Sequence, residues 1–262
     1  MQHIPIFHTI SNTVNYIISS YKEILRTTAL FITLNFIVVL LVPSMVEKFY
    51  DMENQSISSI GALTLLKLIL NIILLVVTIR TIVNLHRIFI DQSNKITVTD
   101  IFGFGKRDLK YLFKAFLLNG LIWLFVGSSF YLFILFLKWG AFEFPQLTRY
   151  EEYIPYVIVF ILISIFLPIV SRFVLVLPSI AVDMELSFTK SWNLTRGNSI
   201  RLSILLMLIP FTVFVVFTLL PIINSFVYGT IVILLWFITL IFEIGILSLS
   251  YSYLANKQEK FP

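Results

Sequence analysis

Two adjoining segments of the chain decide the fold: PIVSRFVLVLPSIAVD at residues 168–183 and KSWNLTRGNSIR at residues 190–201. In the first segment, Arg172 lies inside an apolar run that two prolines bracket and that Asp183 closes. In the second, a short polar stretch ends at Gly197, and another long apolar run follows. This succession is typical of a transmembrane helix, a short interfacial helix and a further transmembrane helix.

The composition of the whole chain agrees with that interpretation. Of its 262 residues, 58% are hydrophobic and only 13% are charged, which does not fit a water-soluble globule. Apolar runs of about eighteen residues or more recur, and each is long enough to cross a hydrocarbon layer of about 30 Å. The chain has no cysteine, so disulfides and thiolate metal sites are excluded.

The apolar runs predict an all-α membrane protein with six transmembrane helices. We expect the spans at residues 27–46, 60–85, 111–137, 154–182, 202–223 and 227–254. Several of them contain proline, which predicts kinks in those helices. Arg80 lies near the end of the second span, where its side chain is expected to reach the membrane surface.

The distribution of basic residues predicts the orientation. Of the 19 Lys and Arg residues, thirteen fall in the N-terminal segment, the loops near 87–114 and 190–201, and the C-terminal tail, against three in the opposite loops. By the positive-inside rule both termini are cytoplasmic, in a multi-pass protein of a bacterial inner membrane. The net charge of +5 is then explained by anionic lipid rather than by nucleic acid.

A short amphipathic segment precedes each odd-numbered span, at residues 4–25, 97–110 and 184–198. We expect these segments to form interfacial elbow helices on the cytoplasmic side of one integral membrane domain, 1–262. The domain would consist of three hairpin units, at 1–90, 91–183 and 184–262. For the first elbow two interpretations stay open: it lies in the membrane interface, or it packs on the bundle.

Arg172 and Glu243 are the sharpest candidates for a polar site inside the membrane. On straight helices, each lies about 16 Å from the cytoplasmic end of its span, at 1.5 Å per residue. We therefore expect an Arg172–Glu243 ion pair, either as a structural bridge or as a site for an anionic head group or a proton relay. Asp183, at the start of the third elbow, completes the candidate site.

The third elbow also carries candidate contacts to lipid head groups. Phe188 and Trp192 lie four residues apart and would share one face of the helix at head-group level. Lys190, Arg196 and Arg201 would then meet phosphates at that level.

No arrangement of residues predicts catalysis. The only histidines are His3, His8 and His86, and none has metal-ligand spacing with another histidine or a carboxylate cluster. No nucleophile elbow, phosphate-binding loop or pair of carboxylates is present. We therefore expect no enzyme activity, metal or cofactor.

The opening segments resemble the membrane domain associated with glycerophosphoryl diester phosphodiesterases and related bacterial inner-membrane proteins of unknown function. The residues that carry the resemblance are Arg172, Pro178, Asp183, Ser191, Trp192, Leu194, Thr195, Arg196, Gly197 and Asn198. Asp183 stands where those families more often have Glu. The resemblance implies a membrane module without phosphodiesterase activity, because the catalytic barrel of such enzymes has no counterpart in this chain.

Three functions remain as expectations from the sequence. The first is a non-catalytic module that organises or regulates a membrane partner or the local lipid. The second is a transporter or lipid-handling protein that uses Arg172 and Glu243, and the third is a membrane-embedded enzyme. The expected partners are the bilayer, anionic phospholipid, and a membrane protein or second copy of the chain.

Overall fold

The computed structural model describes residues 3–50, 57–91, 96–143, 154–207, 212 and 225–258. Within these ranges the chain is helical and contains no strand, which confirms the all-α prediction. Three helical segments among them are long and apolar enough to cross a membrane: Leu68–Ile90, Lys106–Ser129 and Leu234–Ala255. The count of six spans and the orientation stay predictions, and most of the predicted fifth span lies outside the described residues.

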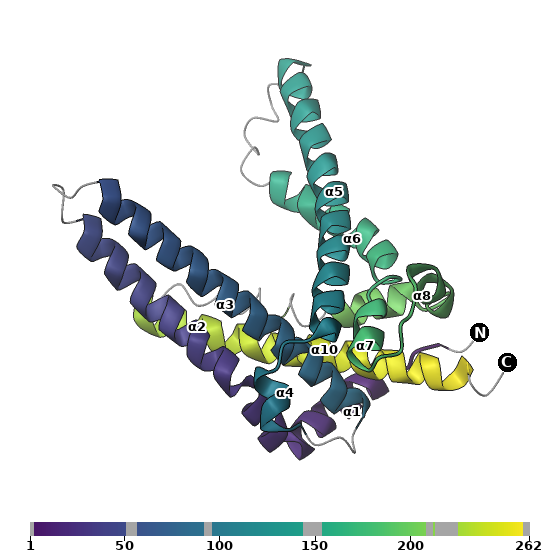
Figure 1. Cartoon of the computed structure of the whole chain (residues 1–262). Helices are drawn as coiled ribbons and strands as arrows, with labels where there is room; N and C mark the ends of the chain where they lie inside the picture. Colours follow the sequence, from purple (N-terminus) through teal and green to yellow (C-terminus); the bar gives the residue numbers. More distant parts are fainter. Residues whose placement is uncertain are drawn as a thin grey trace.

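Figure 1 shows long helices that diverge from a common end, which we call the base. The helices are α1 (Ile6–Ser19), α2 (Tyr21–Tyr50), α3 (Ile57–Ile90), α4 (Val98–Phe102), α5 (Lys106–Glu143), α6 (Ile154–Val170), α7 (Val176–Ala181), α8 (Phe188–Leu194) and α10 (Ser225–Gln258), and the backbone is also helical at 199–207. Helices α2 and α3 lie side by side, as do α5 and α6, and the two pairs point in different directions. The short helices α1, α4, α7 and α8 all lie at the base.

Both ends of the described chain meet at the base. The hydroxyl of Tyr253, near the end of α10, donates to the carbonyl of His3 at 3.3 Å. The first and last described segments therefore lie at the same end of the bundle, the arrangement that an even number of crossings produces. Which side of the membrane this end faces stays a prediction.

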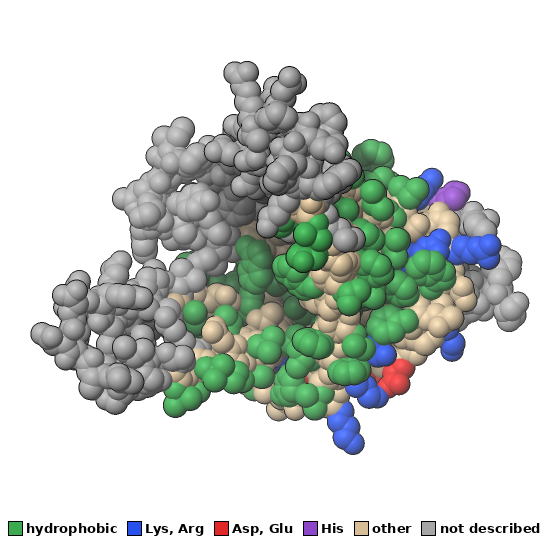
Figure 2. Space-filling model, turned by 90° about the horizontal axis from the view of Figure 1, so that it is seen from above, with side chains coloured by type: hydrophobic (Ala, Val, Ile, Leu, Met, Phe, Trp, Pro, Cys, Tyr) green, Lys and Arg blue, Asp and Glu red, His purple; other side chains and the backbone are tan. Residues whose placement is uncertain are grey.

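The core is concentrated at the base, because α3 packs there against α2, α5, α7 and α10. In the last third of α3, Val83, Leu85 and Phe89 are almost completely buried. Earlier in the same helix, Leu68 and Ile72 are more than half exposed. Such apolar exposure suits contact with hydrocarbon. On the face shown in Figure 2, the described side chains are mostly hydrophobic, and Lys and Arg gather toward the side of α8 and the termini.

The predicted fourth span is not one helix, which corrects the expected depth of Arg172. Helix α6 ends at Val170, the backbone turns at 171–175, and α7 follows. Pro168 lies inside α6 and removes one bond a turn earlier, but the ladder still holds at Ser171, whose N–H donates to the Leu167 carbonyl at 2.8 Å. The N–H groups of Arg172 and Phe173 instead bond three residues back, at 3.2 and 2.8 Å. Arg172 therefore lies just beyond the end of α6, in the turn between two helices, rather than inside one continuous helix.

The predicted elbows correspond to short helices with narrower bounds. The second elbow, 97–110, divides into α4 and the first turn of α5, and the third contains α8. In the first elbow, α1 packs on α10 and α2. It buries Thr9 and Thr13, whose hydroxyls bond to main-chain carbonyls one turn earlier at 2.9 and 2.8 Å. Helix α1 therefore packs on the bundle and leaves Phe7 88% exposed, while its position in the membrane interface stays a prediction.

Gly245 permits the close approach of α10 to both α1 and α3. A Cβ atom at this position would lie 2.7 Å from Cγ2 of Thr13 and 2.9 Å from two ring carbons of Phe89. The ring of Phe89 is only 1% exposed and has little room to move aside. The glycine is therefore required by packing between three helices.

Gly245→Ala should lower the free energy of unfolding by about 1–3 kcal/mol through overpacking. Gly120→Ala is the matched control, because a Cβ there meets nothing within 4 Å. Its stability should stay the same or rise slightly through better helix propensity. Thermal unfolding of the purified variants in detergent compares the two, and equal melting temperatures for both alanine variants would contradict the packing argument.

Candidate functional site at the base

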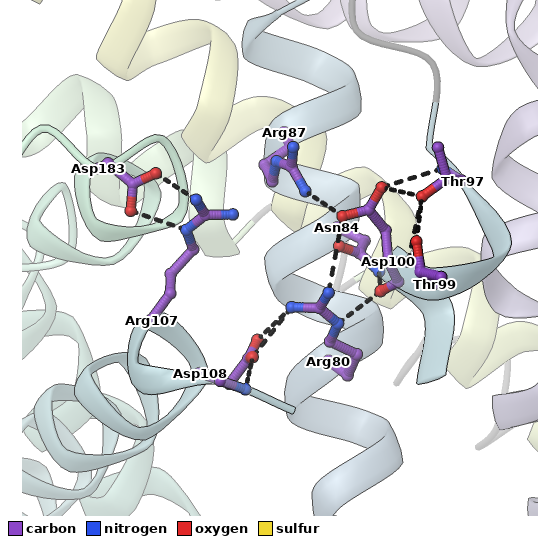
Figure 3. A network of polar contacts seen from close by, with 10 residues as sticks. Arg80, Asn84, Arg87, Thr97, Thr99, Asp100, Arg107, Asp108 and Asp183 are labelled. Carbon is purple, nitrogen blue, oxygen red and sulfur yellow. Dashed lines mark hydrogen bonds and ion pairs between the residues drawn. The ribbon is translucent and has the colours of Figure 1, made fainter. Parts of the chain in front are cut away.

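A buried arginine–aspartate pair fixes the start of α5 to α3. The guanidinium of Arg80 donates from Nη1 to both carboxylate oxygens of Asp108, at 3.0 and 2.9 Å (Figure 3). The Asp108 side chain is fully buried, and it also accepts from the N–H of Gly105 at 2.8 Å. The Arg80 side chain is only 12% exposed, so protein groups enclose it, and its expected reach to the membrane surface stays a prediction.

The same face of α3 holds the α4 turn through Asp100. Asn84 donates to the main-chain carbonyl of Asp100 at 2.8 Å, and Arg87 meets its carboxylate at 3.2 Å. Arg80, Asn84 and Arg87 follow one another at helical spacing. The pKa of Asp100 is lowered to about 2, mainly by the hydrogen bond from the Thr97 side chain. The backbone N–H of Thr97 and the guanidinium of Arg87 lower it further. Asp100 is therefore ionised at neutral pH, and its contacts hold the α4 turn against α3.

A buried polar chain joins α3 to α5 and α10. Nδ1 of His86 lies 2.7 Å from the hydroxyl of Ser248, and Nε2 lies 3.2 Å from the hydroxyl of Tyr111. Because Ser248 donates to the carbonyl of Ile244, it accepts from Nδ1–H, and Nε2 accepts from Tyr111. With 1% exposure, His86 links helices and is closed to solvent. Sequence spacing gave no sign of these partners.

The third elbow caps the break between α6 and α7. The hydroxyl of Ser191 donates to the carbonyl of Arg172 at 2.6 Å, and the hydroxyl of Thr195 approaches the same oxygen at 3.5 Å. This carbonyl is freed where the helix unwinds, and freed carbonyls at membrane depth need such partners. Ser191 of the SWNLTRG segment therefore holds the break, while Thr195 donates to the carbonyl of Ser191 at 2.9 Å.

The Arg172 side chain lies on an aromatic surface. Its guanidinium carbon is 4.1 Å from the centroid of the Trp192 ring. Phe173 joins that ring to Phe188, with centroid distances of 5.2 and 5.8 Å, and Lys114 from α5 places its ammonium 4.7 Å from the Phe188 centroid. We call Trp192, Phe173 and Phe188 the aromatic ladder. It carries a cation at each end.

The expected Arg172–Glu243 ion pair is not formed. No salt bridge joins the two side chains, and Arg172 stacks on Trp192 instead. Glu243 is partly buried on α10 and has no ion pair within the described part of the chain. The estimate of matching depth assumed a continuous fourth span, and the break at 171–175 removes that assumption.

Asp183 belongs to a different pair. Its carboxylate accepts two hydrogen bonds from Arg107 at the start of α5, one of them 2.8 Å long from Nε. The hydrogen bond and charge of Arg107 lower the pKa of Asp183. Beside it, Lys110 bonds to Glu185. Asp183 therefore lies outside any site formed by Arg172 or Glu243.

Asn198 and Arg201 hold the N-terminal segment against the third elbow. The N–H of Ile4 donates to the side-chain carbonyl of Asn198 at 2.7 Å, and Arg201 donates to the carbonyl of Ile4 at 3.0 Å. Gly197, with φ 79°, supplies the left-handed turn that presents Asn198. Of the four expected head-group contacts, Arg201 thus serves an internal role, Trp192 supports Arg172, and Lys190 and Arg196 are exposed.

No metal centre is evident at the base, because the described residues contain no group of three or more His, Cys, Asp or Glu side chains able to share an ion. The residues that sequence reasoning missed are Arg80, Asp100 and Asp108. The sequence held one signal that these acids have a structural role, since Asp100 and Asp108 are the only acidic residues in 92–142.

No protein-family model, curated protein or solved structure matches the chain, so the resemblance given above stays a prediction.

Arg80→Ala should lower the free energy of unfolding by about 3–5 kcal/mol, because it leaves the buried Asp108 carboxylate without its cation. Arg107→Ala removes an arginine from a solvent-exposed pair and should cost about 0–1 kcal/mol. Thermal unfolding in detergent separates the two. Equal losses for both would show that the burial of Asp108 does not matter.

Asn198→Ala should cost about 1–3 kcal/mol, since the buried N–H of Ile4 loses its acceptor. Asn193→Ala, an exposed asparagine on α8, is the control and should be nearly neutral. Limited proteolysis near the N-terminus gives a local readout, because release of Ile4 should accelerate cleavage only in the Asn198 variant. Unchanged protection would contradict the role given to Asn198.

Proposed function

We propose that the protein is a non-catalytic membrane module that binds anionic phospholipid at its base and so organises local lipid or regulates a membrane partner. The observation that carries the proposal is the Arg172 guanidinium lying over the Trp192 ring, 4.1 Å from its centroid, with no carboxylate partner among the described residues. An arginine at the end of a membrane helix is costly unless protein, water or a head group solvates it.

The geometry suits a phosphate. Stacking on an indole ring occupies the face of a guanidinium and leaves its N–H groups at the edge for a planar, two-point contact. Lys114 supplies a second cation at the other end of the aromatic ladder. Tryptophan and other aromatic residues favour the head-group level of a bilayer, where Arg172 lies if α6 spans it. The ladder would thus hold two cations at the depth of lipid phosphates.

The alternative of a transport or proton-relay site lacks comparable support. It needs Arg172 and Glu243 to act together, and no ion pair joins them. An enzyme would need a catalytic set, and none stands out at the aromatic ladder. Lipid binding at the aromatic ladder, by contrast, is supported by contacts within the described residues, the cations of Arg172 and Lys114 on their aromatic rings.

Native mass spectrometry of the full chain from detergent, titrated with phosphatidylglycerol, tests the proposal. Arg172→Ala should weaken binding about fivefold, the effect of roughly 1 kcal/mol per basic residue at a membrane surface. Trp192→Leu should weaken it as well, because the guanidinium loses its support. Arg172→Lys keeps the charge without the planar stack and should fall between the wild type and Arg172→Ala.

Arg26→Ala is the matched control, since Arg26 is an exposed arginine on α2 away from the aromatic ladder. It should bind phosphatidylglycerol like the wild type. If Arg172→Ala also binds like the wild type, the proposed site is wrong. If Arg26→Ala loses as much as Arg172→Ala, the attraction is a general effect of charge and the ladder has no special role.

A further inference from the structure

The two cations of the aromatic ladder are too widely separated for one phosphate to meet both. The guanidinium carbon of Arg172 lies 4.1 Å from the Trp192 centroid, and the ammonium of Lys114 lies 4.7 Å from the Phe188 centroid. Phe173 lies between these two rings, with centroid distances of 5.2 and 5.8 Å. Phe188 and Trp192 are also one turn apart on α8, where Cβ atoms are about 5–6 Å apart. The width of the ladder therefore separates the cations.

Lys114 has no counter-charge within the described residues. It lies about two turns beyond Lys106, the first residue of α5, in the segment that is long and apolar enough to cross a membrane. Glu185, three residues before Phe188 in the chain, is engaged by Lys110 one turn earlier on α5. Charged side chains at such positions need water, a counter-charge or a polar head group around them. Lys114 is thus a second cation that is left for an anionic ligand.

The protein holds the ladder in one arrangement. Trp192 and Phe188 belong to α8, and the hydroxyl of Ser191 fastens that helix to the carbonyl of Arg172 at 2.6 Å. Ser191 is fully buried, so this contact is protected from water. The rings of α8 are therefore fixed against the turn that carries Arg172 and Phe173. Such pre-organisation lowers the entropy cost of binding a ligand along the ladder.

Apolar side chains beyond each cation suit the acyl chains of a lipid. Helix α6 runs toward the base, and it leaves Ile165 and Ile169 exposed in the two turns before Arg172. Helix α5 runs away from the base, and it leaves Leu117 exposed one turn beyond Lys114. On both helices the exposed apolar residues thus lie farther from the base than the cation. A lipid with its phosphates on the ladder would direct its chains along these helices.

We propose that the aromatic ladder binds a lipid whose head group carries two phosphates on one short bridge, as cardiolipin does. One phosphate lies at Arg172 and the other at Lys114. The inference rests on the proposed binding of lipid phosphate at Arg172 and adds the second contact. Arg172 donates paired hydrogen bonds from the edge of its guanidinium, whereas Lys114 acts as a point charge. Basic sites between membrane helices bind head groups of this kind.

Native mass spectrometry of the full chain in uncharged detergent tests the proposal with cardiolipin, phosphatidylglycerol and phosphatidic acid. Cardiolipin should bind about fivefold more tightly than phosphatidylglycerol, because it adds one contact between a phosphate and a basic residue. Phosphatidic acid concentrates its charge on a single phosphate and should also bind less tightly than cardiolipin. If either single-phosphate lipid binds as tightly as cardiolipin, the ladder does not bridge two phosphates.

Dilysocardiolipin controls for the number of acyl chains. It has two phosphates like cardiolipin, but only two chains like phosphatidylglycerol. It should keep the advantage over phosphatidylglycerol, since the phosphates carry the preference. An affinity equal to that of phosphatidylglycerol would show that the extra chains of cardiolipin cause its tighter binding, and the two-phosphate site would then be wrong.

Lys114→Gln locates the second phosphate. The preference for cardiolipin over phosphatidylglycerol should fall from about fivefold to less than about twofold, because the charge is lost. Affinity for phosphatidylglycerol should change by less than about twofold, which also shows that the variant is folded. Lys114→Arg keeps the charge and should keep the preference. Lys106→Gln is the matched control, since Lys106 is an exposed lysine on α5 outside the ladder, and it should bind cardiolipin like the wild type.

A cardiolipin preference that persists in Lys114→Gln, or that falls equally in Lys106→Gln, would overturn the inference. Failure of the proposed function gives a different result, in which Arg172→Ala binds phosphatidylglycerol like the wild type. Loss of phosphatidylglycerol in Arg172→Ala, without any preference for cardiolipin in the wild type, would leave the proposed function standing and assign the ladder to lipids with one phosphate.

Discussion

The buried ion pair of Arg80 and Asp108 sets the arrangement of the base. A carboxylate with no solvent exposure is stable in its charged form only if cations and N–H groups surround it. Arg80 and the N–H of Gly105 do so, and this fixes the first turn of α5 against the last third of α3. Packing of α5 against α6 and α7 adds to this contact at the base.

The third elbow resolves a second constraint, the interrupted helix between α6 and α7. Pro168 and the turn at 171–175 leave main-chain carbonyls without their helical donors, and the hydroxyl of Ser191 donates to one of them. The same elbow holds Ile4 through Asn198. Polar residues that resemble a functional motif in the sequence are therefore largely occupied by main-chain groups. The guanidinium of Arg172, on the aromatic ladder, has no carboxylate partner among the described residues.

Local chemistry could be predicted from the sequence, but partners across the fold could not. Apolar runs of helical length identified the long helices, because the formation of a helix depends mainly on the residues within it. The turn at 171–175 needed more than Pro168, since its carbonyl partners come from residues about twenty positions later. The Arg172–Glu243 hypothesis used depth along straight helices, and it failed because α6 stops before Arg172. The Arg80–Asp108 pair escaped notice because an arginine near a span end has a simpler explanation at the membrane surface.

The basic residues of the base differ in their partners, and the difference bears on the proposed function. Arg80, Arg87, Arg107 and Lys110 each have a carboxylate partner, so their charges are largely cancelled within the protein. Lys114, Arg172 and Lys190 have no such partner among the described residues; two lie on aromatic rings and the third at the wall of a cavity. A topology signal alone requires only that charges lie on one side of the membrane. Placement on aromatic rings goes beyond that requirement, and the proposed binding of lipid phosphate rests on it.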